Sequence, residues 1–112
     1  MINNKSIKRG SIVLCDLPIT DTSIQGDIRP AVIVSNDVSN MHCPVVQIVP
    51  LTRAKKKFLP VHTTVTSTRH ISTALAEQLT VLDKSKIIRV LGTVQEQELE
   101  NIVKAVKIQL AI

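Results

Sequence analysis

The amino-acid sequence predicts a mainly β domain that ends in one α-helix. Short runs rich in Val, Ile and Thr occupy most of the chain, and turn-forming residues separate them. The last segment instead repeats its apolar residues at helical spacing. A chain of 112 residues is expected to form a single domain, residues 1–112. Propensity alone leaves a sandwich, a small barrel and an α+β layer open.

Five runs are expected to be strands, because Pro, Gly or polar residues bound each of them. They are residues 11–17, 30–35, 44–51, 59–65 and 87–94. The apolar run 30–35 predicts a buried strand that begins at a proline, where a missing N–H does least harm. Residues 18–29 predict a long loop, and long ordered loops are often functional. Residues 36–40 predict a turn or a single helical turn.

The C-terminal segment 95–112 predicts an amphipathic helix. Its acidic residues come first and Lys104 and Lys107 come later, which suits the helix dipole. Thr93 is its expected N-cap. Residues 73–82 are ambiguous, because Ala, Leu, Glu and Gln favour a helix while Thr and Val at the ends favour a strand. The apolar residues that define the terminal helix are Leu99, Ile102, Val103, Val106 and Leu110.

The net charge of +5 comes from 14 Lys and Arg against 9 Asp and Glu. Its densest run is the basic segment 53–57 (RAKKK), whereas Glu96, Glu98 and Glu100 lie together near the C-terminus. A basic loop attracts polyanions such as RNA, although a solvated loop that only aids solubility is the ordinary alternative. Phe58 is the only aromatic residue, which argues against a base-stacking platform.

Cys15 and Cys43 form no CxxC pair, and the chain starts with polar rather than leader-like residues. We therefore expect two buried, reduced thiols in a cytoplasmic protein. His42 lies beside Cys43, but the other histidines have no ligand spacing with this pair, so no metal and no cofactor are expected. No apolar run approaches the length needed to span a bilayer.

Four segments then point to one family. They are residues 8–13 (KRGSIV), 23–37 (SIQGDIRPAVIVSND), 49–52 (VPLT), and 76–79 (AEQL) followed by 82–84 (LDK). In this order, and in a chain of this size, they resemble the MazF/PemK family of type II toxin–antitoxin toxins, which includes Kid- and EndoA-like members. The resemblance covers most of the chain, with Ser11 where an acidic residue is usual.

This resemblance implies an SH3-like small β-barrel with a C-terminal helix, assembled as a homodimer whose groove takes RNA. It also favours a strand for the ambiguous residues 73–82. The implied activity is that of an mRNA interferase, an endoribonuclease that cuts single-stranded RNA without a metal. A cognate MazE-like antitoxin, with a disordered and acidic tail, is the implied partner.

The resemblance makes Arg29 and Thr52 the catalytic pair. RNA can be cut without a metal because its own 2′-hydroxyl can attack the adjacent phosphorus, so the protein must align the phosphate, stabilise charge and move protons. A guanidinium offers charged donors that match phosphate oxygens, and a threonine at a strand end can donate its hydroxyl. The ordinary alternatives are an ion pair between Arg29 and Asp27 or another carboxylate, and a Thr52 that only caps a turn.

The expected RNA-binding residues share either the loop of Arg29, the basic run or the later family block. Amide side chains suit base edges because they both donate and accept, and Lys and Arg suit phosphates. These residues are Ser23, Gln25, Arg53, Lys55, Lys56, Glu77 and Gln78.

Two positions depart from the family pattern. Ile24 stands where Glu is often found, so a carboxylate that assists as a base or in binding would be missing. Asp27 stands where a small neutral residue is common, and it could orient or partly neutralise Arg29. Both departures allow reduced activity or an altered sequence preference.

Two other functions remain open from sequence. Gyrase-binding CcdB toxins resemble the same fold but act through a Trp-containing C-terminus, and this chain has no Trp. A non-catalytic RNA- or protein-binding descendant fits Ile24, but the presence of both Arg29 and Thr52 counts against it.

Overall fold

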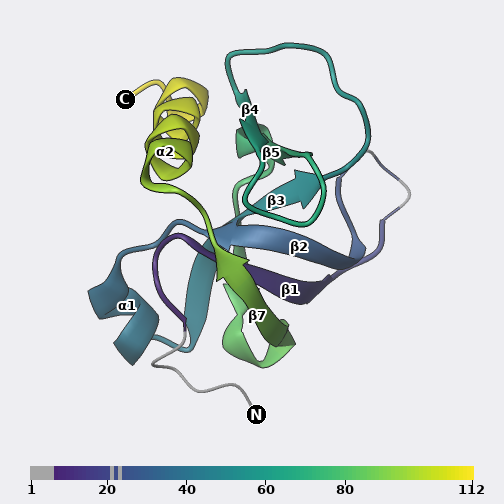
Figure 1. Ribbon diagram of the computed structural model, residues 1–112. Helices are drawn as coiled ribbons and strands as arrows, with labels where there is room; N and C mark the ends of the chain where they lie inside the picture. Colours follow the sequence, from purple (N-terminus) through teal and green to yellow (C-terminus); the bar gives the residue numbers. More distant parts are fainter. Residues whose placement is uncertain (1–6, 21, 23) are drawn as a thin grey trace.

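Seven antiparallel strands form the body of the molecule, with a long helix packed beside them (Figure 1). The computed structural model describes residues 7–20, 22 and 24–112. The strands are β1 (Ser11–Leu17), β2 (Asp27–Ile33), β3 (Val45–Thr52), β4 (His62–Val65), β5 (Ser72–Leu75), β6 (Thr80–Asp83) and β7 (Ile87–Thr93). The helices are α1 (Asp37–His42) and α2 (Glu96–Leu110), with 3-10 turns η2 (Ala76–Gln78) and η3 (Lys84–Lys86).

The strand order is β4-β5-β3-β2-β1-β7, and β6 also pairs with β3. The predicted mainly β fold with a C-terminal helix is therefore confirmed. The expected barrel is not fully closed, because no pairing among the described strands joins β4 to β7. Two register shifts between β1 and β7 add local twist at that end of the sheet.

Neighbouring residues of the central strands enter two different hydrophobic clusters. Ile12, Val32 and Val49 belong to the cluster that also contains Ile102 of α2. The residues next to them in β1 and β2, Val13 and Ile33, belong to the second cluster. Successive side chains of a strand point to opposite faces, so the sheet has apolar partners on both sides. This explains why residues 30–35 form a continuous apolar run.

Strand β2 begins at Asp27, three residues before the predicted start at Pro30. Pairing with β3 involves only residues 31 to 33, so Pro30 has β1 as its single neighbouring strand. A proline is tolerated there because it cannot interrupt ladders on both sides. Strand β4 is also shorter than predicted and covers His62–Val65. Strands β1, β3 and β7 agree with their predicted bounds to within a residue.

Residues 73–82 form two strands with a turn between them, so the single strand that the resemblance favoured is wrong in detail. Leu51 of β3 pairs with Ala74, whereas Ile48 pairs with Thr80. From Ile48 to Leu51 the chain advances three residues, whereas from Ala74 to Thr80 it advances six. The three extra residues are looped out as η2. Helix-favouring residues and strand pairing coexist here because the helical turn is confined to this insertion.

Helix α2 begins after Gln95, so the prediction that Thr93 is the N-cap is wrong. Thr93 is the last residue of β7, and Val94 still donates a backbone hydrogen bond to Gly10 (3.0 Å). Gln95 and Glu98 then form a reciprocal capping box, which satisfies the first free N–H groups of the helix. The helix packs against β4 and η2.

The two cysteines differ, contrary to the prediction that both are buried. Cys15 in β1 is fully buried and Cys43 is exposed, because Cys43 follows the short surface helix α1. Burial, assisted by the neighbouring Asp16 carboxylate, raises the pKa of the Cys15 thiol to about 11. Cys15 is therefore an unreactive core residue. None of the described helices is long and apolar enough to cross a membrane.

The contribution of α2 to the core can be tested with two isoleucines of the same helix. Ile102 is 0% exposed within the cluster that also contains Ile12, Val32 and Val49, whereas Ile108 is 50% exposed. We expect Ile102→Ala to lower the free energy of unfolding by about 2–5 kcal/mol, because it leaves a cavity in the core. Chemical denaturation followed by circular dichroism measures the change. Ile108→Ala is the matched control, and equal losses in both variants would contradict this packing.

Candidate functional site

A groove of about 790 Å³ collects residues from five parts of the fold. Strands β1, β2 and β7 form its floor, the end of β3 forms one wall and the segment between β4 and β5 forms another. Arg29 and Thr52 both line it, so the structure brings the predicted catalytic pair to one cavity. Gln25 and Arg53 line the same groove.

Four arginines give the groove its charge. Arg29 comes from β2, Arg53 follows β3, Arg69 precedes β5 and Arg89 lies on β7. None of the groove-lining residues that the structure describes is acidic. A concave surface with one sign of charge concentrates ligands of the opposite sign. The groove therefore suits a polyanion.

The Arg29 guanidinium is half-buried and held from one side. Its Nε–H donates to the carbonyl oxygen of Gly26 (2.9 Å), which fixes the plane of the guanidinium. Among the described residues, Arg29 makes no ion pair, so the pairing with Asp27 that the sequence allowed is not formed. No described residue accepts a hydrogen bond from either Nη group, so these donors suit a bound anion.

Thr52 is the last residue of β3 and is only 3% exposed. Its Oγ1 accepts a hydrogen bond from the backbone N–H of Ala54 (3.2 Å). This is the turn-capping contact that sequence alone allowed as the ordinary alternative. The contact uses the oxygen as an acceptor, so the hydroxyl proton can still be donated. Capping and donation are thus compatible, and the cap fixes the direction of the hydroxyl.

The turn before Arg29 depends on two special backbone positions. A Cβ at Gly26 would lie 2.5 Å from the carbonyl oxygen of Pro18 and 2.9 Å from Ile19, so no larger residue fits there. Asp27 has a φ of 66°, a left-handed conformation that Asp adopts more easily than most residues. The left-handed backbone at position 27 explains why a small residue suits that position.

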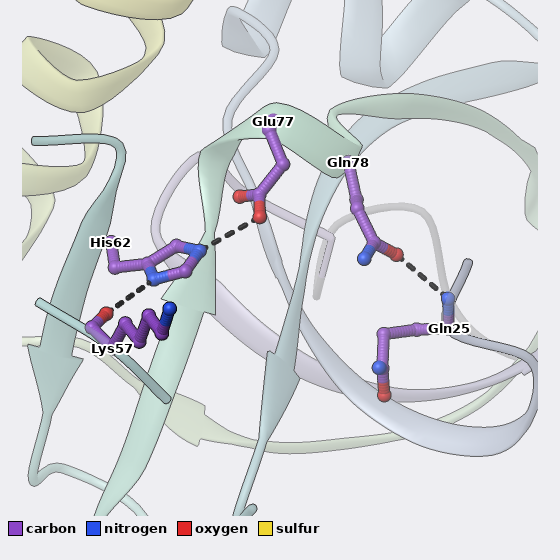
Figure 2. Close-up of polar contacts among 5 residues, drawn as sticks. All are labelled: Gln25, Lys57, His62, Glu77 and Gln78. Atoms are coloured by element: carbon purple, nitrogen blue, oxygen red, sulfur yellow. Dashed lines mark hydrogen bonds and ion pairs between the residues drawn. The ribbon is translucent and has the colours of Figure 1, made fainter. Parts of the chain in front are cut away.

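Gln78 anchors the same loop. Its Oε1 accepts a hydrogen bond from the backbone N–H of Gln25 (2.7 Å), as Figure 2 shows. The looped-out turn η2 thereby fixes the segment that leads into Arg29. The Oε1 atom of Gln25 is itself buried and has no hydrogen-bond partner among the described residues. Gln25 lines the groove and two neighbouring hollows, so its side chain lies where all three meet.

Glu77 is exposed, and it pairs with a histidine rather than with a lysine. Its Oε2 lies 2.7 Å from Nε2 of His62, and Nδ1 of His62 lies 2.9 Å from the carbonyl oxygen of Lys57 (Figure 2). A carbonyl oxygen only accepts, so Nδ1 carries a proton, and a second proton on Nε2 suits the carboxylate. This contact ties the basic loop to η2.

The protonation of His62 follows from these contacts. Burial alone would lower the pKa of His62, but the hydrogen bonds to Glu77 and to the Lys57 carbonyl raise it above the ordinary value of 6.5. A raised pKa in the folded state means that His62 stabilises the fold at acidic pH, below its ordinary pKa. That contribution is lost as the pH rises through the folded-state value.

The other predicted RNA-binding residues are more scattered. Lys56 shares a hollow with Arg29 beside the groove, and Glu77 and Gln78 line another hollow that includes Gln25. Lys55 is exposed on the basic loop and lines none of these hollows. Ser23 lies outside the described residues. Ile24 is 58% exposed, so the position that departs from the family pattern faces solvent.

Sequence reasoning missed one whole wall of the groove. Ser67, Thr68, Arg69 and His70 line it, although the sequence indicates only a connection there. Arg89 was hidden within a predicted strand. The one available signal was the pair Arg69-His70 in a polar loop, and basic residues in a loop are usually solvated. Only the fold brings them to the same groove as the predicted residues.

The fold and groove thus define a small, β-rich protein suited to a polyanionic ligand. A family model described as "PemK-like, MazF-like toxin of type II toxin-antitoxin system" matches residues 8–110. The endoribonuclease MazF of Staphylococcus saprophyticus is 31% identical over an alignment of 111 residues. The alignment covers 95% of this chain and 92% of that protein. The chain belongs to the PemK-like, MazF-like toxin family.

Solved structures agree with this assignment. An endoribonuclease from a Mycobacterial species, solved in complex with its cognate antitoxin, is 25% identical with a TM-score of 0.81, and the match covers 95% of this chain and 96% of that one. MazF from Deinococcus radiodurans has a TM-score of 0.84 at 21% identity, with 96% and 98% of the two chains covered. At 21% identity, the similarity to the Deinococcus protein shows a shared fold only.

The contact between Glu77 and His62 makes a prediction about titration. We expect Glu77→Gln to lower the pKa of His62, because the variant removes the carboxylate that favours the imidazolium. An NMR pH titration of the imidazole protons measures this change. The control is Glu100→Gln, which removes an exposed carboxylate of α2 and should leave His62 unaffected. Identical His62 titrations in the Glu77 variant and the parent would show that the pair does not form.

Proposed function

We propose that this chain is an mRNA interferase: an endoribonuclease toxin that cuts single-stranded RNA without a metal and is neutralised by a cognate antitoxin. The observation that carries the proposal is the meeting of Arg29 and Thr52 in one arginine-lined groove. Family membership supports the same activity, since the related Staphylococcus saprophyticus protein is an endoribonuclease.

The proposed reaction is a transesterification within the RNA. The 2′-oxygen forms a bond to the adjacent phosphorus while the bond from phosphorus to the 5′-oxygen breaks. The 2′-hydroxyl loses a proton and the departing 5′-oxygen gains one, so the products end in a 2′,3′-cyclic phosphate and a 5′-hydroxyl. The nucleophile belongs to the substrate, so the protein contributes positioning, charge and proton transfer.

Arg29 would stabilise the extra negative charge on the phosphate in the transition state. Its Nε–H is occupied by Gly26, so the two Nη groups would face the non-bridging oxygens. Thr52 would donate its hydroxyl to a non-bridging or leaving oxygen while the Ala54 N–H holds its oxygen in place. A hydroxyl is too weak an acid or base to act alone.

The remaining groove residues would bind the RNA on either side of that linkage. Arg53 lies in the groove and Lys56 lines the adjoining hollow, where their charges would contact phosphates without reading sequence. Gln25 lines the groove, where its amide would hydrogen-bond to a base edge. Glu77 and Gln78 would act at the hollow that they share with Gln25.

The partners follow from the same proposal. An acidic, disordered segment of an antitoxin would compete with RNA for the cationic groove, and it would order as it binds. A Mycobacterial relative was solved in complex with its cognate antitoxin. We further propose a homodimer that acts in the cytoplasm, where its mRNA substrate is found.

A cleavage assay with EDTA tests the activity and the role of Arg29 together. We expect the purified protein to cut a long unstructured RNA at discrete sites, leaving 2′,3′-cyclic phosphate ends. Arg29→Ala should lower the rate by a hundredfold or more, on the order expected for a lost charge-stabilising donor. Arg9→Ala, which removes an exposed arginine next to α2, is the charge-matched control. Intact RNA with the parent protein, or full activity of Arg29→Ala, would contradict the proposal.

The role of the basic loop can be tested through salt. Replacing both Arg53 and Lys56 by Gln should weaken RNA binding and flatten its dependence on salt, by about 0.7 in the log–log slope for each phosphate that the protein no longer neutralises. Fluorescence anisotropy with a labelled oligoribonucleotide at several salt concentrations measures the slope. The control replaces Lys104 and Lys107 of α2, which removes the same charge away from the groove. Equal slopes in the two double variants would show that the loop only faces solvent.

A further inference from the structure

Glu98 is the most heavily engaged carboxylate in the described structure. It lies in the first turn of α2 and is only 7% exposed. Its Oε1 accepts from the backbone N–H of Gln95 (3.0 Å) and from the Ser67 hydroxyl. Its Oε2 accepts from the backbone N–H of Thr66 (2.6 Å) and from the Thr66 hydroxyl (3.1 Å).

This arrangement exceeds what a helix cap requires. Of the bonds that Glu98 accepts, a capping box needs only the one from the N-cap backbone N–H, here that of Gln95. The other three bonds join Glu98 to Thr66 and Ser67, which lie 32 and 31 residues earlier in the chain. Ser67 also accepts from the Gln95 backbone N–H (3.2 Å), so the cap and the distant segment share one network.

The segment that Glu98 holds leads directly into the groove. Ser67 is itself a groove-lining residue, and the next three residues, Thr68, Arg69 and His70, line it as well. The Thr68 hydroxyl donates to the His70 carbonyl, so this stretch has one further internal contact. Between β4 and β5 the chain otherwise lies outside the strand ladders. Glu98 thus binds Thr66 and Ser67, the two residues that lead into the groove-lining stretch containing Arg69.

The chemistry of Glu98 suits a permanent anchor. Burial would raise the pKa of its carboxyl, but the hydrogen bonds from Ser67, Thr66 and Gln95 outweigh this effect and lower it. The group is therefore an anion at neutral pH, and all of its described partners are donors. Hydrogen bonds to a charged acceptor are about twice as strong as neutral ones.

We propose that Glu98 is a positioning residue for the RNA groove: it fixes the wall formed by residues 67–70 and so holds Arg69 in place for a phosphate of the bound strand. This inference rests on the proposed function, because the anion in the groove is taken to be single-stranded RNA. Glu98 does not contact the RNA and acts only through Thr66 and Ser67.

The experiment measures binding separately from cleavage. The probe is a fluorescein-labelled 2′-O-methyl oligoribonucleotide of mixed sequence, which cannot be cut because its 2′-hydroxyl is blocked. Glu98→Gln keeps the size of the side chain but replaces an acceptor oxygen by an amide donor. We expect it to weaken binding at least about tenfold, since small misplacements of a binding group are costly. Glu100→Gln, an exposed acid of the same helix, is the control and should bind as the parent does.

A double-mutant cycle distinguishes positioning from a general loss of stability. If Glu98 acts through the wall of residues 67–70, Arg69→Gln should cost much less binding in the Glu98→Gln background than in the parent. Arg53→Gln changes an arginine that follows β3 and lies outside this wall, so it should cost the same in both backgrounds. Circular dichroism melts define a temperature at which all the variants are folded. A general loss of stability would affect both arginine cycles equally, and that result would overturn the proposal.

A second variant covers the case in which Glu98→Gln does not fold. Ser67→Ala removes the hydrogen bond that Ser67 donates to Glu98 and the one that it accepts from the Gln95 N–H, and it leaves the bond between the Gln95 N–H and Glu98 intact. Its effect on binding should also be non-additive with that of Arg69→Gln. Additive effects in this cycle would overturn the proposal as well.

The outcomes separate this inference from the proposed function. Parent-like binding by folded Glu98→Gln would overturn the positioning role and leave the nuclease untouched. Binding of the blocked oligonucleotide by the parent, without cleavage of ordinary RNA, would overturn the nuclease while the double-mutant cycle still decides the role of Glu98. No binding by the parent protein would overturn both.

Discussion

Strand β3 pairs with three other strands, and the placement of the groove residues depends on this pairing. Its N-terminal half pairs with β6, its C-terminal end with β5, and its other edge with β2. Thr52 ends this strand, so its hydroxyl is fixed by the most constrained element of the sheet. Arg29 lies on β2, just before the residues of β2 that pair with β3. Both side chains therefore take their positions from backbone ladders rather than from flexible loops.

The same pairing creates the turn that carries Glu77 and Gln78. Three residues are looped out where the chain passes from β5 to β6 along β3. Gln78 uses this position to hold the loop before Arg29, and Glu77 uses it to hold His62 at the end of the basic loop. A local irregularity of the sheet thus fixes two loops. It also directs Glu77 toward a histidine, and among the described residues no carboxylate lines the groove.

Much of the fold was predictable, because strand periodicity and helix amphipathicity are local signals. Residues 11–17 and the C-terminal helix agree closely with their predicted bounds. The N-cap was not predictable in the same way, since Gln95 is an uncommon cap that works here only with Glu98 and Ser67. The exposure of Cys43 also depends on tertiary structure, because a cysteine pattern does not indicate which face a short helix presents.

The sequence predicted only some of the residues that line the candidate site. Motif resemblance identified Arg29 and Thr52, and the structure places both in one groove. Arg69 and Arg89 were missed because no local pattern shows which cation of a loop or strand turns toward a distant groove. The bulged register between β1 and β7 and the anchoring of Thr66 by Glu98 are long-range effects of that kind.

The tight turn at Gly26 has a different consequence, which concerns how this loop can evolve. Pro18 presses its carbonyl against the Gly26 backbone, whereas Ile19 and Ile24 face solvent. The side chains at positions 19 and 24 can therefore vary without a clash in the core, whereas the position of Gly26 is restricted to a single amino acid.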